Sequence, residues 1–71
     1  MSAWCVIVQH DAVDVYGPFN TRKKAAEWRT ALVEEEYSED FDISELNDAD
    51  DVWSENMNDI EISVARLNNP D

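Results

Sequence analysis

The sequence predicts an α+β domain in which one main helix packs on a three-stranded antiparallel sheet, in the order β-β-α-(α)-β. Three observations predict this class: an apolar run near the start, a helical apolar pattern after a Gly-Pro pair, and an alternating segment near the end. A chain of 71 residues has room for one hydrophobic core only. We therefore expect a single domain over residues 1–71.

The first two expected strands form a hairpin. Residues 3–8 are apolar at every position, which is typical of a central strand that is buried on both faces. A short polar break at His10 and Asp11 separates this run from residues 13–16, whose alternation predicts a half-buried edge strand. Gly17-Pro18 is then expected to end the strand and turn the chain, because proline restricts its own backbone and that of the preceding residue.

The main helix is expected over about residues 21–36. Asn20 or Thr21 can cap its N-terminus through a side-chain oxygen. Apolar residues then recur at spacings of three and four, which places them on one helical face. These residues are Ala25, Trp28 and Leu32, with Ala31 as a further candidate.

A second, acidic amphipathic helix is expected from about residue 43 to residue 56, within an acidic segment that spans residues 34–59. Asp42 and Glu45, three residues later, resemble a capping box. Four apolar residues fall at offsets that fit one helical face: Ile43, Leu46, Trp53 and Met57. Whether this segment is helical or mobile, and whether Trp53 is a core or an interface residue, the sequence leaves open.

The last expected strand covers residues 60–67. Ile60, Ile62 and Val64 alternate with less apolar residues there, as in a strand with one buried face. A helix that returns across the sheet brings this strand beside the first one, so residues 3–8 lie in the middle of the sheet. Residues 13–16 and 60–67 then form its two edges.

The charge is strongly negative and unevenly placed. Seventeen acidic residues against five basic ones give a net charge of −12. Thirteen of the acids lie between Glu34 and Glu61, with no Lys or Arg among them. Such a chain is a poor direct ligand for nucleic acid or an anionic membrane, and its field attracts basic surfaces. The basic cluster Arg22-Lys23-Lys24 is expected to pair with the acidic segment within the molecule.

Cysteine usage and the N-terminal residues favour a reduced, cytoplasmic setting. A lone cysteine, Cys5, excludes an internal disulfide, and the start of the chain lacks the features of a secretory signal. No run of eighteen apolar residues is present, so we expect no membrane-spanning segment.

The sequence offers little for catalysis or metal binding. Neither Cys5 nor His10 has a second catalytic group near it in sequence, and a nucleophile needs a base and an orienting group. A calcium loop that starts at Asp48 would place Trp53 where the loop needs glycine, and Asp59 where it needs a bidentate glutamate. We therefore expect no enzyme activity, no metal and no cofactor.

The junction between the hairpin and the main helix resembles a known pattern. Residues 16–21, Tyr-Gly-Pro-Phe-Asn-Thr, are followed by Ala25 and Trp28. This arrangement resembles short, mostly uncharacterised proteins encoded by bacteriophages, especially those of actinobacteria. The resemblance covers about the first half of the chain. It implies a strand-to-helix corner and a viral origin, and it brings no catalytic residue.

The acidic segment carries the functional expectation. Carboxylates three or four residues apart on a helix lie about 5–6 Å from one another, so an acidic helix can approach the charge density of a phosphate backbone. We expect a phage-type inhibitor that occupies the basic groove of a host nucleic-acid-binding protein. The expected contact residues are Glu35, Glu36, Glu39, Asp40, Asp42, Glu45, Asp48, Asp50, Asp51 and Glu55, with Trp53 as an apolar anchor.

Two other interpretations of the acidity stay open. The chain could be an acidic adaptor or regulatory module for a protein partner that does not bind nucleic acid, or the acids could simply keep a small domain soluble. The oligomeric state is also open, because the edges of the sheet could pair into a dimer.

Overall fold

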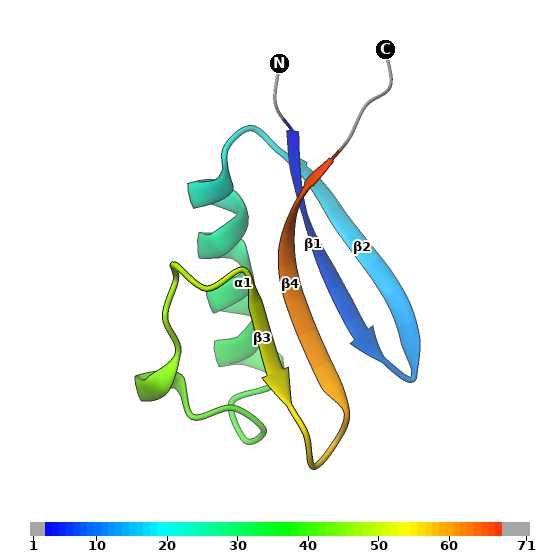
Figure 1. The fold of residues 1–71 in the computed structure, drawn as a ribbon. Helices are drawn as coiled ribbons and strands as arrows, with labels where there is room; N and C mark the ends of the chain where they lie inside the picture. Colours follow the sequence, from blue (N-terminus) through cyan, green and yellow to red (C-terminus); the bar gives the residue numbers. More distant parts are fainter. Residues whose placement is uncertain (1–2, 68–71) are drawn as a thin grey trace.

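The structure is a computed structural model that describes residues 3–67. These residues form a four-stranded antiparallel sheet with one α-helix packed on one of its faces (Figure 1). The elements are β1 (Ala3–His10), β2 (Ala12–Phe19), α1 (Arg22–Glu36), the single 3₁₀ turn η1 (Ile43–Glu45), β3 (Val52–Glu55) and β4 (Ile60–Leu67). The α+β class is confirmed. The predicted domain also included residues 1–2 and 68–71, which lie outside the described residues.

The strand order is β2-β1-β4-β3. β1 pairs with β2 on one side and with β4 on the other, so its predicted inner position is confirmed. The prediction of three strands with β4 at an edge is wrong, because β3 pairs with β4 and covers that edge. Two inner strands therefore support the core, and β2 and β3 are the edges.

The predicted hairpin is confirmed, but β2 is longer than expected. His10 pairs with Ala12, so the chain reverses at Asp11, whose φ of 63° lies in the left-handed region that aspartate tolerates. The strand then continues through Gly17 and Pro18, where we expected it to end. An edge strand accepts proline because its outer side needs no hydrogen-bond donor.

A β-bulge accommodates the Gly-Pro pair. The register between β1 and β2 shifts between Trp4 and Val6, so Gly17 and Pro18 together lie opposite one residue of β1. Gly17 has a φ of 145°, and a Cβ atom at this position would lie 3.0 Å from the carbonyl oxygen of Trp4. Glycine is therefore required where β2 passes closest to β1.

Helix α1 has the predicted limits, and Thr21 is its N-cap. The Thr21 hydroxyl accepts a hydrogen bond of 3.1 Å from the Lys24 backbone N–H. Ala25 is buried as expected, whereas Trp28 and Leu32 are partly buried at the margin of the core and Ala31 is exposed. The buried stripe of the helix consists of Ala25, Ala26, Arg29 and Val33. These residues pack on the inward faces of β1, β3 and β4.

The predicted second helix over residues 43–56 is wrong. Only η1 is helical, and the side chain of Asp42 caps it by accepting a 3.2 Å hydrogen bond from the Ser44 backbone N–H. The Asn47 side chain accepts from the Ala49 backbone N–H at 2.9 Å, a local bond that competes with helix formation. The apolar residues also do not share one face, because Trp53 is 3% exposed and Met57 is 93% exposed.

No helix in residues 3–67 combines the length and the apolar character that crossing a membrane requires.

Candidate functional site

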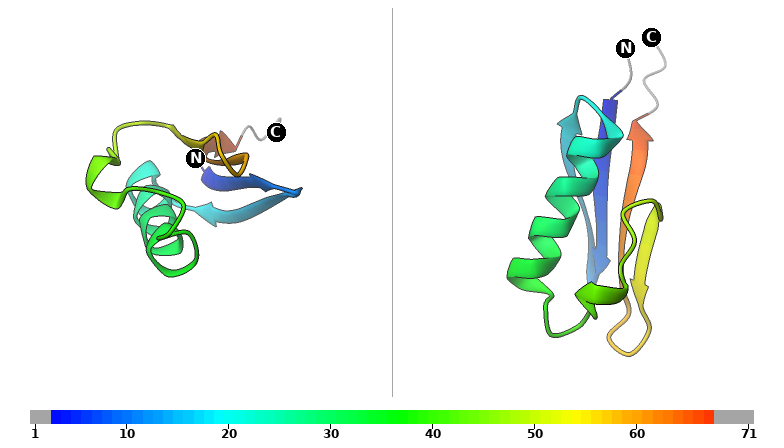
Figure 2. Two further views of the ribbon diagram at one scale, coloured as in Figure 1. Left: turned by 90° about the horizontal axis from the view of Figure 1, so that it is seen from below. Right: turned by 90° about the vertical axis from the view of Figure 1, so that its left-hand side faces the viewer.

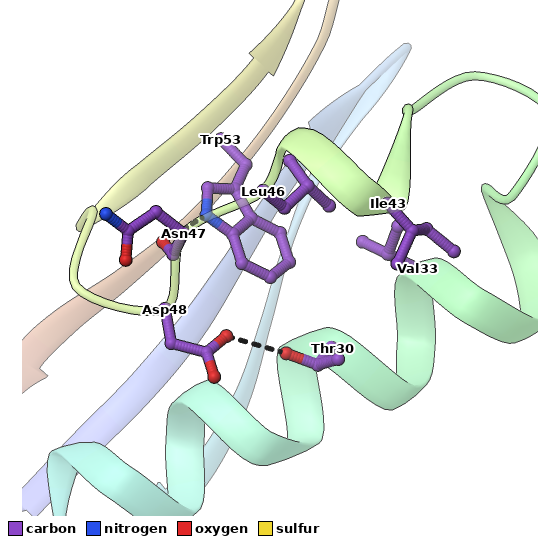
Figure 3. A pocket seen from close by; sticks show the side chains of 7 residues that line it. All are labelled: Thr30, Val33, Ile43, Leu46, Asn47, Asp48 and Trp53. Carbon is purple, nitrogen blue, oxygen red and sulfur yellow. Dashed lines mark hydrogen bonds between the residues drawn. The ribbon is translucent and has the colours of Figure 1, made fainter.

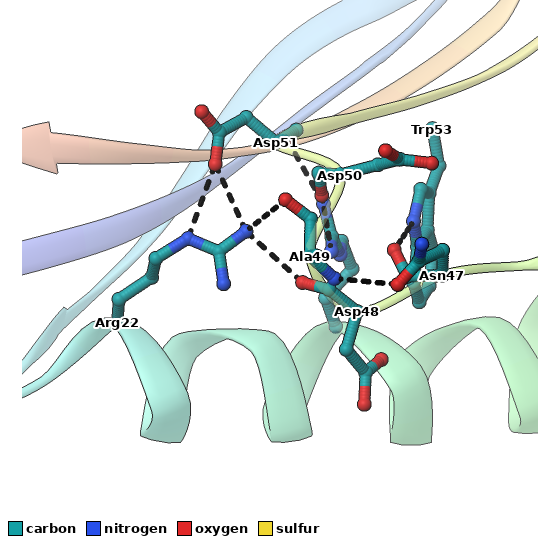
Figure 4. Close-up of polar contacts among 8 residues, drawn as sticks. Arg22, Asn47, Asp48, Ala49, Asp50, Asp51 and Trp53 are labelled. Atoms are coloured by element: carbon teal, nitrogen blue, oxygen red, sulfur yellow. Dashed lines mark hydrogen bonds and ion pairs between the residues drawn. The ribbon is translucent and has the colours of Figure 1, made fainter.

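The structure divides the acidic residues into two regions with different surroundings. We call residues 47–51 the anchored loop and residues 34–45 the outer acidic segment. The anchored loop lies along helix α1 and is held by two arginines of that helix (Figure 4). The outer acidic segment begins in the last turn of α1 and continues through η1.

Arg22 ties the first turn of α1 to the anchored loop. Its Nε and Nη2 atoms donate to Asp51 Oδ1 at 3.1 and 2.9 Å. Nη2 also donates to the carbonyl oxygens of Asp48 and Ala49, at 3.0 and 3.1 Å. These contacts offset the unfavourable position of a cation at a helix N-terminus. The expected pairing of the basic cluster with the acidic segment is thus confirmed for Arg22, whereas Lys23 and Lys24 are exposed.

Arg29 is the buried charge of the domain core. Its residue is 0% exposed, and its Nη1 and Nη2 atoms donate to the carbonyl oxygens of Asp51 and Asp50, both at 2.9 Å. The guanidinium carbon lies 3.7 Å from the ring centroid of Trp53, which is a cation–π contact. Nε makes no hydrogen bond. Burial, and secondly the charge of Arg22, lower the pKa of Arg29 to about 10, so the group stays charged at neutral pH.

Arg29 is not among the residues expected from the sequence to have a functional role. Its position four residues after Ala25 and four before Val33 places it on the buried helical stripe. That spacing is the only sequence feature that indicates burial of Arg29. A charged residue at such a position normally lies at the exposed margin of the buried stripe.

A cleft opens between α1 and the chain that runs from η1 into the anchored loop. It has a volume of about 400 Å³, within the range of ligand-sized pockets. Thr30 Oγ1 lies 3.1 Å from Asp48 Oδ1 at one end of this cleft, and the buried indole of Trp53 forms part of its wall (Figure 3). The lining residues are Thr30, Val33, Ile43, Leu46, Asn47, Asp48 and Trp53.

The outer acidic segment carries carboxylates that the domain does not use. Glu34, Glu35 and Glu36 occupy the last turn of α1, where there is no basic residue. Glu39 and Glu45 follow on the exposed surface. None of these five carboxylates makes a hydrogen bond or an ion pair with any part of residues 3–67. All five therefore face solvent with their charges uncompensated by an internal contact.

The titration of Tyr37 reflects this negative surface. Burial raises the pKa of the Tyr37 hydroxyl, and the charges of Glu36, Asp14 and Asp40 raise it further. A negative potential opposes formation of a phenolate, so the direction of the second effect agrees with an uncompensated acidic region at the end of α1.

The remaining expected contact residues have internal partners, with one exception. Asp40 accepts a 2.8 Å hydrogen bond from the Asn58 amide, and Asp42 caps η1. Glu55 accepts from the backbone N–H groups of Met57 and Asn58, at 2.8 and 2.9 Å. The exception is Asp50, whose exposed carboxylate accepts no hydrogen bond.

The expected contact residues therefore do not form one continuous outward face. Asp48 and Asp51 bind groups of α1, while the five glutamates of the outer acidic segment point away from the domain. Trp53 is a core residue and lies beneath Arg29. Of the candidate contacts, the carboxylates without an internal partner among residues 3–67 are those of Glu35, Glu36, Glu39, Glu45 and Asp50.

Cys5 and His10 are not brought together. Cys5 is buried and His10 is exposed, and strand alternation places them on opposite faces of β1. The His10 ring instead makes an edge contact with Tyr37, with centroids 6.3 Å apart. Among residues 3–67 no group of three or more His, Cys, Asp or Glu side chains is arranged to hold a metal ion.

Comparison of the chain with protein-family models, with curated proteins and with solved structures finds no match.

Proposed function

We propose that this chain is a protein-binding inhibitor that presents the outer acidic segment to the basic surface of a host nucleic-acid-binding protein. One observation carries the proposal. Three consecutive glutamates occupy the last turn of α1, and no basic side chain of the described residues compensates them.

These glutamates are unfavourable for the helix itself. The C-terminus of a helix carries a partial negative charge, so each acid in the last turn costs about 0.3–1 kcal/mol at low ionic strength. Glutamine would occupy the same positions without this cost, because it has nearly the same shape and no charge. Compared with glutamine, glutamate at these positions adds only an exposed negative charge. That charge favours binding to a cationic partner.

A nucleic-acid-binding protein is the partner that this surface fits best. Its binding groove holds Lys and Arg side chains that exchange counterions for phosphates, and they can exchange them for carboxylates in the same way. The resemblance of residues 16–28 to short bacteriophage proteins supports a viral inhibitor that acts in the host cytoplasm. The contact residues of this proposal are Glu34, Glu35, Glu36, Glu39 and Glu45.

The cleft beside α1 supports a second candidate function. An adaptor module could receive an apolar side chain of its partner between Val33, Ile43 and Leu46. Such an interface would depend on apolar burial, so its affinity would change little with salt. Salt dependence therefore separates the two candidates.

A capture experiment tests the proposal. The wild-type chain and the variant Glu34→Gln/Glu35→Gln/Glu36→Gln are immobilised, and host proteins are captured at about 50 mM and about 200 mM salt. The control variant Asp11→Asn/Asp14→Asn/Glu27→Gln removes the same charge from other exposed positions. Each captured protein is then assayed for displacement from its DNA or RNA by the free chain.

The proposal expects a protein that the wild type and the control capture at low salt, that the glutamine variant loses, and that releases its nucleic acid as the chain is added. Capture that is equal for all three chains contradicts it. So does capture without any displacement of nucleic acid.

A further inference from the structure

The sheet has one covered and one open face. Helix α1 and the chain that follows it lie on one side of the sheet only (Figure 2). On the other side, strand pairing aligns one residue from each strand in a single row: Val15, Ile7, Ser63 and Val52. None of these four side chains is charged.

This open face is largely apolar and exposed, and its polar side chains are Gln9, Ser54, Ser63 and Glu61. Val13 and Val15 on β2 are 64% and 60% exposed, Val52 on β3 is 47% exposed, and Leu67 on β4 is 41% exposed. Ile7 and Ala65 lie between them and are partly exposed. By strand alternation, Glu61 is the only charged side chain that residues 3–67 place on this face. A face almost free of charge stands out in a chain with 31% charged residues.

We propose that the open face is the interface of a symmetric dimer, with a second copy of the chain stacked face to face. A largely apolar surface with one carboxylate can pack against a copy of itself and needs no basic surface on its partner. The outer acidic segment lies on the helix side, so this arrangement keeps the two acidic regions on opposite outer sides. Contact through the helix sides of two chains, each with a charge of −12, would instead bring the two outer acidic segments together.

The size of the face predicts a weak dimer. Four strands about 4.8 Å apart, paired over about six residues of about 3.3 Å each, give a face of roughly 400 Å². Two such faces bury roughly 800 Å², about half of a standard interface of ~1,600 Å². The dimer should therefore form at high micromolar concentration and dissociate on dilution.

The oligomeric state of the full chain tests this inference. Sedimentation equilibrium from about 10 μM to about 1 mM should show the mass rising from the 8.2 kDa of one chain toward twice that value. Added salt should strengthen the dimer, because it screens the repulsion between two acidic chains. Salt should weaken the capture of a basic partner, so the two associations are distinguishable.

Two variants locate the interface. Val15→Lys and Val52→Lys lie near opposite edges of the open face, and each should weaken the dimer at least tenfold, because stacking would bury an unpaired ammonium. Both side chains are exposed, so the variants should keep the circular dichroism spectrum and urea midpoint of the wild type. Glu35→Lys also introduces a lysine, but on the helix side, outside the proposed interface. It should leave the dimer intact, or strengthen it by lowering the net negative charge.

Two results overturn the inference. One is a wild-type mass that stays at 8.2 kDa up to the highest concentration. The other is a Val52→Lys variant that dimerises like the wild type, because a face-to-face interface would bury that charge without a partner. If the wild-type chain does not dimerise but still captures a basic partner, the dimer is disproved and the proposed function is not.

Discussion

The anchored loop and the outer acidic segment have similar compositions and opposite surroundings. Both are rich in acids and lie next to each other in sequence. The anchored loop faces Arg22 and Arg29, whereas the five glutamates of the outer acidic segment face solvent. The comparison teaches that the donors which the fold brings to each segment, and not the number of acids, decide which carboxylates have a partner inside the domain.

The two arginines act mainly on the backbone of the loop. Arg22 and Arg29 are seven residues apart, about two helical turns, so they lie on the same side of α1. Together they donate to the carbonyl oxygens of four consecutive residues, 48–51. The Asp51 carbonyl also accepts the Val64 backbone N–H, whereas for the other three carbonyls the guanidinium groups supply donors that secondary structure does not. The guanidinium groups thus make it possible for the loop to pack closely and lead into β3.

Removing Arg29 should have the largest effect on the anchored loop. Arg29→Met keeps the volume but removes one donor from each of the Asp50 and Asp51 carbonyls, and should lower the free energy of unfolding by about 2–4 kcal/mol. The Asp51 carbonyl would keep the Val64 backbone N–H as a donor. Urea unfolding followed by circular dichroism measures the loss of stability. Arg29→Lys keeps the positive charge but not the two separate N–H donors of the guanidinium. Its free energy of unfolding should lie between those of the Met variant and the wild type. A Met variant as stable as the wild type would contradict the role given to Arg29.

A smaller loss is expected from Trp53→Phe. The indole N–H donates to the Asn47 carbonyl oxygen at 3.0 Å, and the ring lies against the Arg29 guanidinium. Phenylalanine keeps a smaller ring and loses the donor, so the free energy of unfolding should fall by about 1–2 kcal/mol. Chemical denaturation checks this value. Trp28→Phe is the matched control. An equal fall in its free energy of unfolding would show that the Trp53 hydrogen bond and cation–π contact add no stability of their own.

The smallest effect in the anchored loop is expected from Asp51→Asn. The side chains of Arg22 and Asp51 are 30% and 69% exposed, so solvent weakens their ion pair. We expect a loss of about 0.5 kcal/mol at low salt that disappears at high salt. Asp50→Asn is the control, since its carboxylate accepts no hydrogen bond. A loss that persists at high salt would argue against an electrostatic origin.

Local patterns were enough to predict the hairpin, helix α1 and strand β4. Each of these elements has a sequence signal of its own, namely an apolar run, a cap followed by helical spacing, or a regular alternation. Strand β3 was missed because its four residues are stabilised by pairing with β4 and by the burial of Trp53. Neither contact is visible in the residues themselves, and the spacing of Ile43, Leu46 and Trp53 also fits a helix.

The candidate site was predictable in kind and not in extent. Composition identifies the acidic region, and the exposed glutamates of the last helical turn lie where the sequence places them. The inward use of Asp48 and Asp51 depends on Arg22 and Thr30, which come close only after the chain has folded. No local spacing connects these residues, so the sequence overestimates the surface that is open to a partner.

Urea unfolding of two charge variants, side by side at low salt, tests the division of the acidic region most directly. Glu34→Gln/Glu35→Gln/Glu36→Gln should raise the free energy of unfolding by about 1 kcal/mol, because it removes three charges that the helix end opposes. Asp48→Asn/Asp51→Asn should lower it by about 1 kcal/mol, because it weakens contacts with Arg22 and Thr30. Opposite signs are the predicted result. Equal signs, or a glutamine variant that is less stable than the wild type, would contradict the account.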